Sequence, residues 1–235
     1  MLTKTFANKN KKSAPQRREP GRESNNLNLL HKNKRWIALQ KETNYLKAAD
    51  DCRSFLRLYQ SQRGEIYQRL GIIYYFHIDD KEEAKTAFEN SLIYDKYNHY
   101  TLSMLGRINE DLGDNLAAEE FFKKASAAGQ FNKPLLGKFY LRRCRFEEAF
   151  ETFATCNNIL IAGVGSSYKS HVFLKGITLF LLGNESRVEI IDNRAKEIIT
   201  GSGIGRADAL YEIDDIRLAP VLTELVKDFV ESFLE

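Results

Sequence analysis

The chain has 235 residues, of which 43% are hydrophobic and 29% are charged, and both values are ordinary for a globular domain. Four prolines and fourteen glycines are too few for a loop-rich or collagen-like chain, and scarce proline favours long helices. The net charge of +3 is too small by itself to indicate a nucleic-acid partner.

Basic residues are concentrated at the amino terminus. Residues 1–26 hold seven Lys and Arg against two Glu, a net charge of +5, so the rest of the chain carries −2. Because this segment has little to bury, we expect a disordered tail. Three roles stay open for it: a solvated terminus, contact with nucleic acid or an anionic surface, or a targeting or docking peptide.

Three cysteines without a close pair indicate no disulfide framework and favour a reducing compartment. The polar, basic sequence after Met1 does not resemble a signal peptide, and no run approaches the roughly 18 apolar residues of a membrane helix. We therefore expect a cytoplasmic protein, or a nuclear one in a eukaryote.

Apolar residues recur at helical spacing from Leu27 onward and predict two helices, near 27–42 and 44–60. Asn44 suits the N-cap of the second. The carboxyl-terminal stretch from Leu218 to Leu234 carries a wide apolar stripe at the same spacing and predicts one terminal helix, with Pro220 near its start.

A unit repeats between these segments at a nearly fixed period. Ala84 and Phe88 are followed 34 residues later by Ala118 and Phe122, and 31 residues after that by Ala149 and Phe153. A Leu-Gly pair precedes each set, and a weaker fourth copy contains Gly176, Gly183 and Ala195. We expect each unit to be two antiparallel helices, with glycine leaving room for the second helix and phenylalanine packing into the next unit. Gly113 and Gly183 are expected at the turns.

This pattern resembles the tetratricopeptide repeat family, whose period is about 34 residues and whose unit carries Leu-Gly, small and aromatic residues at these offsets. The match covers residues 64–199 and implies an all-α fold, an α-solenoid of about four helix-turn-helix units. The repeat-ending proline of the family is missing, and 157–170 is an irregular junction. Residues 27–63 are a candidate degenerate repeat, and 200–235 a linker with a capping helix.

Patterns that would indicate catalysis or metal binding are weak. Gly163–Ser167 and Gly201–Arg206 lack a preceding strand and a Walker-type ending, so we expect flexible linkers. The four histidines have neither metal nor triad spacing. Cys144 and Cys156 suit small core positions, and the acidic run Asp79–Glu83 suits a helix end. No catalytic site, metal or cofactor is predicted.

In the family, the first helix of each unit lines a concave groove that holds partner segments. Carried over, the resemblance implies a protein-binding groove formed by Gln68, Ile72, Tyr75, Phe76, Ser103, Arg107, Glu110, Lys138, Leu141, Arg142, Phe173, Ile177 and Phe180. Aromatic and arginine residues are typical of binding hot spots. For Ile72, Leu141, Phe173 and Ile177, a place in the core between helices is the alternative. Gln68 and Ile72 stand where a chaperone-tail clamp would have Lys and Asn, so no such clamp is expected.

We therefore predict a non-enzymatic protein–protein interaction adaptor or assembly factor that binds a partner segment in the groove. One alternative is an RNA-associated helical-repeat protein using the basic tail with Arg107, Lys138, Arg142 and Arg143, whose affinity would fall steeply with salt. Another is a chaperone for a secreted protein. A hydrolase or transferase would need an acid–base pair in a pocket, and the sequence indicates none.

Overall fold

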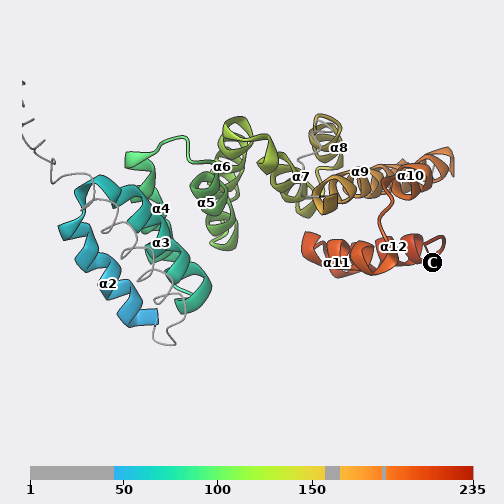
Figure 1. Cartoon of the computed structure of the whole chain (residues 1–235). Coiled ribbons are helices and arrows are strands. Elements are labelled where there is room, and N and C mark those ends of the chain that lie inside the picture. Colours follow the sequence, from blue (N-terminus) through green and yellow to red (C-terminus); the bar gives the residue numbers. More distant parts are fainter. Residues whose placement is uncertain (1–44, 157–164, 187–188, 235) are drawn as a thin grey trace, which may run out of the picture. The chain divides into compact units, whose positions relative to one another are not determined.

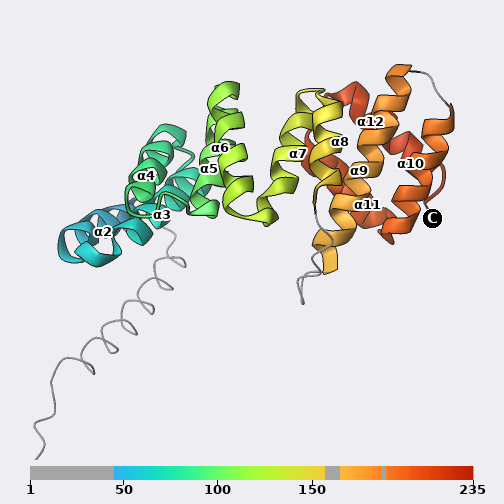
Figure 2. The ribbon, with the colours of Figure 1, turned by 90° about the horizontal axis from the view of Figure 1, so that it is seen from above.

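The computed structural model describes residues 45–156, 165–186 and 189–234, which are helical throughout and contain no strand (Figures 1 and 2). The chain divides into two compact units, Met1–Ala48 and Ala49–Glu235. Of the first unit, only the start of helix α2 (Tyr45–Leu58) is described. The predicted tail, the helix near 27–42 and the cap at Asn44 lie outside the described residues.

The second unit is a series of helix pairs. Its helices are α3 (Arg63–Ile73), continued by a π-helical turn η2 (Tyr74–Ile78), α4 (Lys81–Tyr94), α5 (His99–Asp111), α6 (Asn115–Ala128), α7 (Lys133–Arg142), α8 (Phe146–Ala154), α9 (Gly165–Ser186), α10 (Glu189–Ser202), α11 (Arg206–Ile216) and α12 (Pro220–Glu231). Short 3-10 turns, η1 (Gln60–Gln62) and η3 (Gln130–Asn132), precede α3 and α7. α3 packs on α4, α5 on α6, α7 on α8 and α9 on α10, which confirms the repeated pairs.

Polar caps and tight turns separate these helices. Asp80, Asn98 and Asp114 cap the starts of α4, α5 and α6, each accepting a 3.0 Å hydrogen bond from the backbone N–H three residues later. The turns before α4, α6 and α8 each contain a left-handed residue, namely Asp79, Gly113 and Cys144. Cys144 is therefore exposed at a turn. Its predicted core position is wrong, because the reversal of the chain turns this residue toward solvent.

A phenylalanine ring of the second helix lies against a glycine of the first in each of the first three pairs. A Cβ atom added to the glycine would lie 2.5–2.7 Å from the nearest ring carbon, closer than real Cβ atoms come. The partners are Gly71 with Phe88, Gly106 with Phe122, and Gly137 with Phe153. The rings were predicted to pack into the next unit. They rest instead on their own unit's glycine, although Phe122 also meets Phe139 of the next pair, with ring centroids 5.4 Å apart.

The fourth pair departs from this arrangement. Gly176 approaches Ile199 instead of a phenylalanine, and a Cβ there would lie 2.5 Å from it. Gly183 was predicted at a turn but lies inside the 22-residue α9, buried against Ile191 of α10. That prediction is wrong because the apolar stretch before Gly183 continues as one helix against α10 and carries the glycine into the interior of the pair.

The two glycine-rich segments are not simple linkers where the structure describes them. Helix α9 begins at Gly165, and residues 163–164 lie outside the described part. Gly201–Arg206 forms an ordered turn in which the Ser202 hydroxyl donates to the Ile199 carbonyl (2.6 Å) and accepts from the Ile204 N–H (3.1 Å). The side chain of Ile204 is buried. The buried Ile204 side chain and the two hydrogen bonds of Ser202 hold this turn in one conformation. The prediction of a flexible linker is therefore wrong here.

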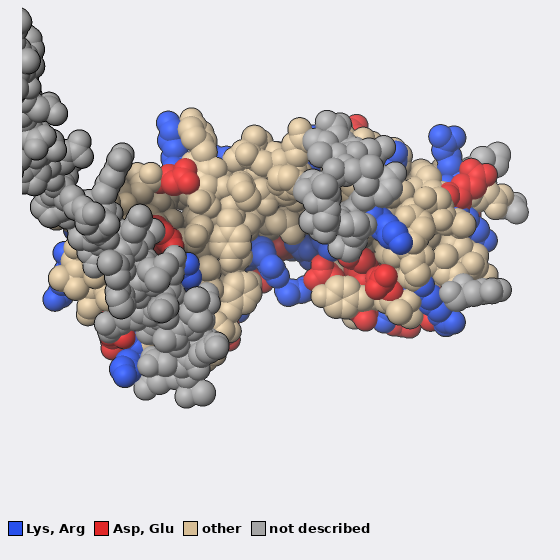
Figure 3. All heavy atoms as spheres, in the orientation of Figure 1, with Lys and Arg blue, Asp and Glu red and all other residues tan. Residues whose placement is uncertain are grey.

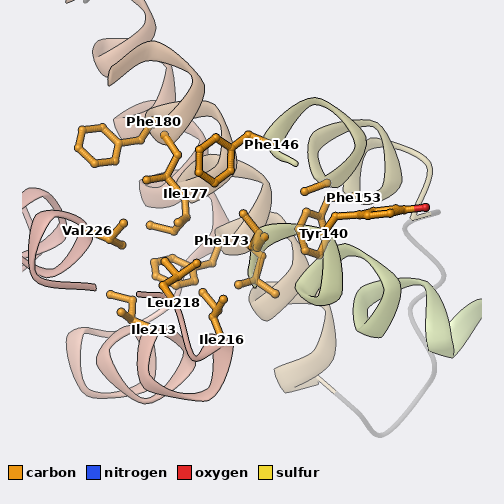
Figure 4. Packing of buried hydrophobic residues seen from close by; sticks show 14 of the residues in the cluster. Tyr140, Phe146, Phe153, Phe173, Ile177, Phe180, Ile213, Ile216, Leu218 and Val226 are labelled. Carbon is orange, nitrogen blue, oxygen red and sulfur yellow. The ribbon is translucent and has the colours of Figure 1, made fainter. Parts of the chain in front are cut away.

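The carboxyl-terminal segment forms two helices, α11 and α12, where one was predicted. Arg217, in the left-handed region, ends α11, and Pro220 begins α12. α11 packs on α7 and α9, the first helices of the third and fourth pairs. Figure 4 shows Ile213, Ile216 and Leu218 beside Phe173 and Ile177 of α9, and all of them are buried. The terminal helices therefore belong to the main hydrophobic core.

An ionic cluster joins the second and third pairs. Arg145 donates to Glu119 (2.6 Å) and Glu148 (2.8 Å), and Lys123 donates to Glu119 (2.7 Å). The Tyr140 hydroxyl also donates to Glu119 (3.2 Å). Partial burial alone would raise the pKa of Glu119, but the hydrogen bonds from Arg145 and Lys123 outweigh it and lower the pKa to about 2. The carboxylate is therefore held in its charged form.

The glycine–phenylalanine contact predicts that Gly137→Ala destabilises the fold by about 1–3 kcal/mol, because the new Cβ would overlap the buried Phe153 ring. Gly201→Ala is the matched control, since no atom lies within 4 Å of its added Cβ. The control should be neutral, or stabilising by up to about 1 kcal/mol through helix propensity. Urea denaturation followed by circular dichroism measures both, and equal midpoints would refute the steric role of glycine.

The lowered pKa of Glu119 predicts a pH-dependent effect of Glu119→Gln. Ionised Glu119 stabilises the fold above its unfolded-state pKa of about 4.5, and this contribution is lost as the pH falls toward its folded-state pKa of about 2. The melting temperature of the wild type should exceed that of the variant near neutrality, and the gap should shrink with acidification. Glu120→Gln, which removes an exposed pair with Lys124, should show little gap at any pH. A gap for Glu119→Gln that stays constant from neutrality to acid would contradict the assignment.

Candidate partner-binding groove

The predicted groove residues lie on the first helices of the four pairs, but five of them are buried in the core. These are Ser103, Leu141, Phe173, Ile177 and Phe180. A side chain with no exposed surface cannot meet a partner without unpacking the core. Leu141, Phe173 and Ile177 therefore follow the alternative role, filling the core between helices. Phe180, predicted to line the groove, is buried with them.

Helix α11 covers the predicted groove over the third and fourth pairs. Lys138 of α7 donates to Glu212 (2.9 Å) and Asp215 (2.6 Å) of α11, and its side chain is only 13% exposed. Ser170 of α9 also donates to Glu212. With Ile213 and Ile216 buried on the same helix, α11 occupies this half of the groove as an internal ligand.

Arg142 connects three helices at the edge of the closed half. Its guanidinium donates in bidentate fashion to Glu110 of α5 (2.7 and 2.6 Å) and reaches the Ile216 carbonyl at the end of α11 (3.4 Å). Arg143 lies 3.6 Å from the same Glu110. Bidentate arginine–carboxylate pairs are among the stronger polar contacts in proteins. The pair holds α5, α7 and α11 in register.

The first two pairs leave an open half, formed by α3, η2 and α5. Gln68 donates to Asn98 (3.2 Å) and Thr101 (3.1 Å), and the Tyr75 hydroxyl donates to Asp111 (2.5 Å). Partial burial and this hydrogen bond raise the pKa of Tyr75 to about 12, so the phenol stays neutral at physiological pH. These bonds tie the first pair to the second and leave Gln68 and Tyr75 little freedom to bind anything else.

Phe76 is an exposed aromatic residue of this open half, with 51% of its surface accessible. It packs edge-on against Tyr75, with ring centroids 4.8 Å apart and planes at 87°. Both rings lie in the π-helical turn η2, a feature that is frequent at functional sites. Ile72, half-buried, lies one helical turn before Phe76. The open half therefore offers an apolar anchor point.

A charged pocket of about 160 Å³ separates the open half from the closed half. Its walls combine four cations, three carboxylates and two apolar side chains: Arg107, Lys138, Arg142, Arg217, Glu110, Asp111, Asp215, Phe122 and Leu135. In Figure 3, basic and acidic side chains border the hollow between α5 and α11. Asp111, Asp215 and Arg217 were not predicted as site residues. The amphipathic stretch Arg206–Ile216 is the signal that could have placed a helix there.

Most charges of this pocket are paired. Asp111 lies 4.0 Å from Arg217 and accepts from Tyr75, Glu110 pairs with Arg142, and Asp215 with Lys138. Partial burial alone would raise the pKa of Asp215, but the Lys138 hydrogen bond and nearby cations lower it. Arg107 forms no ion pair or hydrogen bond with any residue that the structure describes. Arg107 is thus a cation of this pocket without an ion pair among the described residues.

The described residues contain no arrangement that indicates catalysis. No group of three or more His, Cys, Asp or Glu side chains in them could hold a metal ion. Burial, with a smaller effect of Asp51, raises the pKa of Cys52 to about 12, and burial also raises that of Cys156. Both thiols are therefore protonated at neutral pH and weakly nucleophilic. Cys156 is half-buried near the end of α8.

The comparisons with known proteins agree with this architecture. A family model of the tetratricopeptide repeat matches residues 99–127, which span α5 and nearly all of α6. The crystal structure of MamA is similar over 73% of this chain and 90% of that chain, with 16% identity and a TM-score of 0.54. No curated protein shows a significant match.

Two further solved structures resemble the chain at TM-scores below 0.5. The C-terminal part of a TPR repeat-containing protein from Cytophaga hutchinsonii is 11% identical, covering 83% of this chain and 93% of that one, with a TM-score of 0.44. A TPR repeats protein from Bacteroides fragilis is 13% identical, covering 81% and 92%, with a TM-score of 0.39.

No helix among the described residues has both the length and the apolar character needed to span a bilayer. The resemblance inferred from the Leu-Gly and phenylalanine spacing is confirmed by the family match over the second pair and by the succession of helix pairs. The chain contains a tetratricopeptide repeat at α5 and α6, within a series of helix pairs packed as tetratricopeptide-like repeats.

Proposed function

We propose that this chain is a non-catalytic adaptor that holds a segment of a partner protein on the open half of its groove, formed by α3, η2 and α5. Tetratricopeptide repeat proteins generally mediate protein–protein interactions. The observation that carries the proposal is Phe76, which is 51% exposed and lies four residues after half-buried Ile72, while α11 covers the other half. An exposed aromatic residue on a supported helix is a typical binding anchor.

The charge pairs argue against nucleic acid in the groove. Three of the four cations considered for phosphate contacts, Lys138, Arg142 and Arg143, lie beside carboxylates of this chain. A phosphate would have to displace those carboxylates and would then be repelled by them. The basic segment 1–26 lies outside the described residues, so its possible contact with nucleic acid or an anionic surface stays a prediction.

The remaining parts of the assignment are proposals of the same kind. Three free thiols suit a reducing, cytoplasmic compartment. A chaperone for a secreted protein is one specific version of such an adaptor. The proposal therefore names a groove, its anchor and a protein partner.

Affinity purification with the full chain as bait tests the proposal. The extract is treated with nuclease, and recovered proteins are chemically cross-linked to the bait and identified by mass spectrometry. We expect Phe76→Ala to cost about 2 kcal/mol, or roughly thirtyfold in affinity, because it removes the aromatic anchor. The partner should then be lost with Phe76→Ala, and wild-type cross-links should fall on α3 and α5.

Leu116→Ala is the matched control, since Leu116 is 85% exposed on α6, the second helix of its pair. This variant should recover the partner as the wild type does. Recovery that survives Phe76→Ala would contradict the proposed groove, and recovery that disappears with nuclease would replace the partner protein with a nucleic acid.

A further inference from the structure

We propose that the open half of the groove selects an acidic segment of its partner, with one carboxylate bound by Arg107. The inference rests on the proposed adaptor function and specifies the chemistry of the partner. Equivalent positions in the second and third helix pairs carry similar side chains. Arg107 and Lys138 hold the same position in consecutive pairs, directly after the Leu-Gly of the first helix.

The closed half shows which chemistry this position binds. Lys138 receives two carboxylates, from Glu212 and Asp215 of α11, at 2.9 and 2.6 Å. Ile213 and Ile216 of the same helix are buried between these contacts and the core. Helix α11, which covers this half, thus combines acidic and apolar side chains. A segment with the same combination is therefore the chemical complement of the surface formed by the first helices.

The equivalent position one pair earlier lacks such a ligand. Glu110 is engaged by Arg142, Asp111 by Tyr75 and Arg217, and Asp215 by Lys138. Arg107 has no carboxylate within 4.0 Å among the described residues. Arg107 lines the charged pocket, and its charge acts on the pKa values of Tyr75, Tyr100 and Asp215. A partly buried guanidinium without an ion pair favours a carboxylate with matching geometry.

The open surface continues the groove that α11 occupies. The position after the glycine is Ile72 in the first pair, Arg107 in the second and Lys138 in the third. A segment that follows on from α11 would therefore place an acidic side chain on Arg107 and an apolar one on Ile72 and Phe76. This continuity, together with the charge complementarity, favours an acidic protein segment over a nucleic acid, whose successive phosphates would meet Glu110 and Asp111.

A displayed library of random-sequence peptides, selected on the full-length protein, tests the inference. Peptides selected by the wild type should be enriched in Asp and Glu. With a selected peptide made synthetically, Arg107→Gln should weaken binding roughly tenfold to hundredfold, as expected for a charge-assisted hydrogen bond. Arg194→Gln is the control, because it removes an exposed arginine on α10 and should leave the affinity unchanged.

A double-mutant cycle assigns the effect to one contact. Changing the critical Glu of the peptide to Gln should weaken binding to the wild type and have little further effect on the Arg107→Gln protein. Selected peptides without acidic enrichment, or a cycle without coupling, would overturn the inference and leave the adaptor function standing. If the wild type selects no peptide, or a fluorescent single-stranded RNA binds in an Arg107-dependent manner instead, both proposals fail.

Discussion

The contact between a phenylalanine ring and a glycine inside each of the first three helix pairs is the physical constraint that sets the geometry of the repeats. The ring fills the space that a Cβ would occupy, so the two helices of a pair approach in one arrangement only. Since the glycine faces the second helix, the next residue is turned by about 100° around the helix axis. This turn brings Ile72, Arg107 and Lys138 to equivalent places in successive pairs, and the repeated contact thereby defines the groove.

The terminal helices decide how much of that groove is open. α11 carries both apolar and acidic residues, and the first helices of the third and fourth pairs offer complementary ones. Burial of Ile213 and Ile216 supplies the stabilisation, roughly 1.5–3 kcal/mol for each fully buried aliphatic side chain. The ion pairs at Lys138 orient α11 but contribute little to the free energy of folding, because desolvation offsets much of their attraction. What remains for a partner is the surface around Phe76 and Arg107.

The spacing of residues predicted the repeat well and the site only in part. Leu-Gly pairs followed by phenylalanine at a constant offset are local consequences of helix-pair packing, so the first three pairs could be predicted from the sequence. Gly183 and Cys144 were misplaced because a helix end depends on what the helix packs against. Of the groove residues, Phe76 and Arg107 lie on accessible surface, whereas Leu141 and Phe173 are buried. Helical periodicity predicts which side chains share one face of a helix. It does not show which distant element covers that face.

The amino-acid pattern was enough to predict the all-α class, the pairing of helices and the resemblance to tetratricopeptide repeats, since all three follow from contacts between residues close in the chain. The tertiary structure alone decided that α11 returns to the third and fourth pairs, because Lys138 and Asp215 are 77 residues apart and only folding brings them to 2.6 Å. The tertiary structure also decided which cations of the charged pocket form ion pairs. Lys138, Arg142 and Arg217 do so, and Arg107 has no such partner among the described residues. A charge is compensated by whatever lies nearest in space, and for Lys138 and Arg142 those neighbours come from remote parts of the chain.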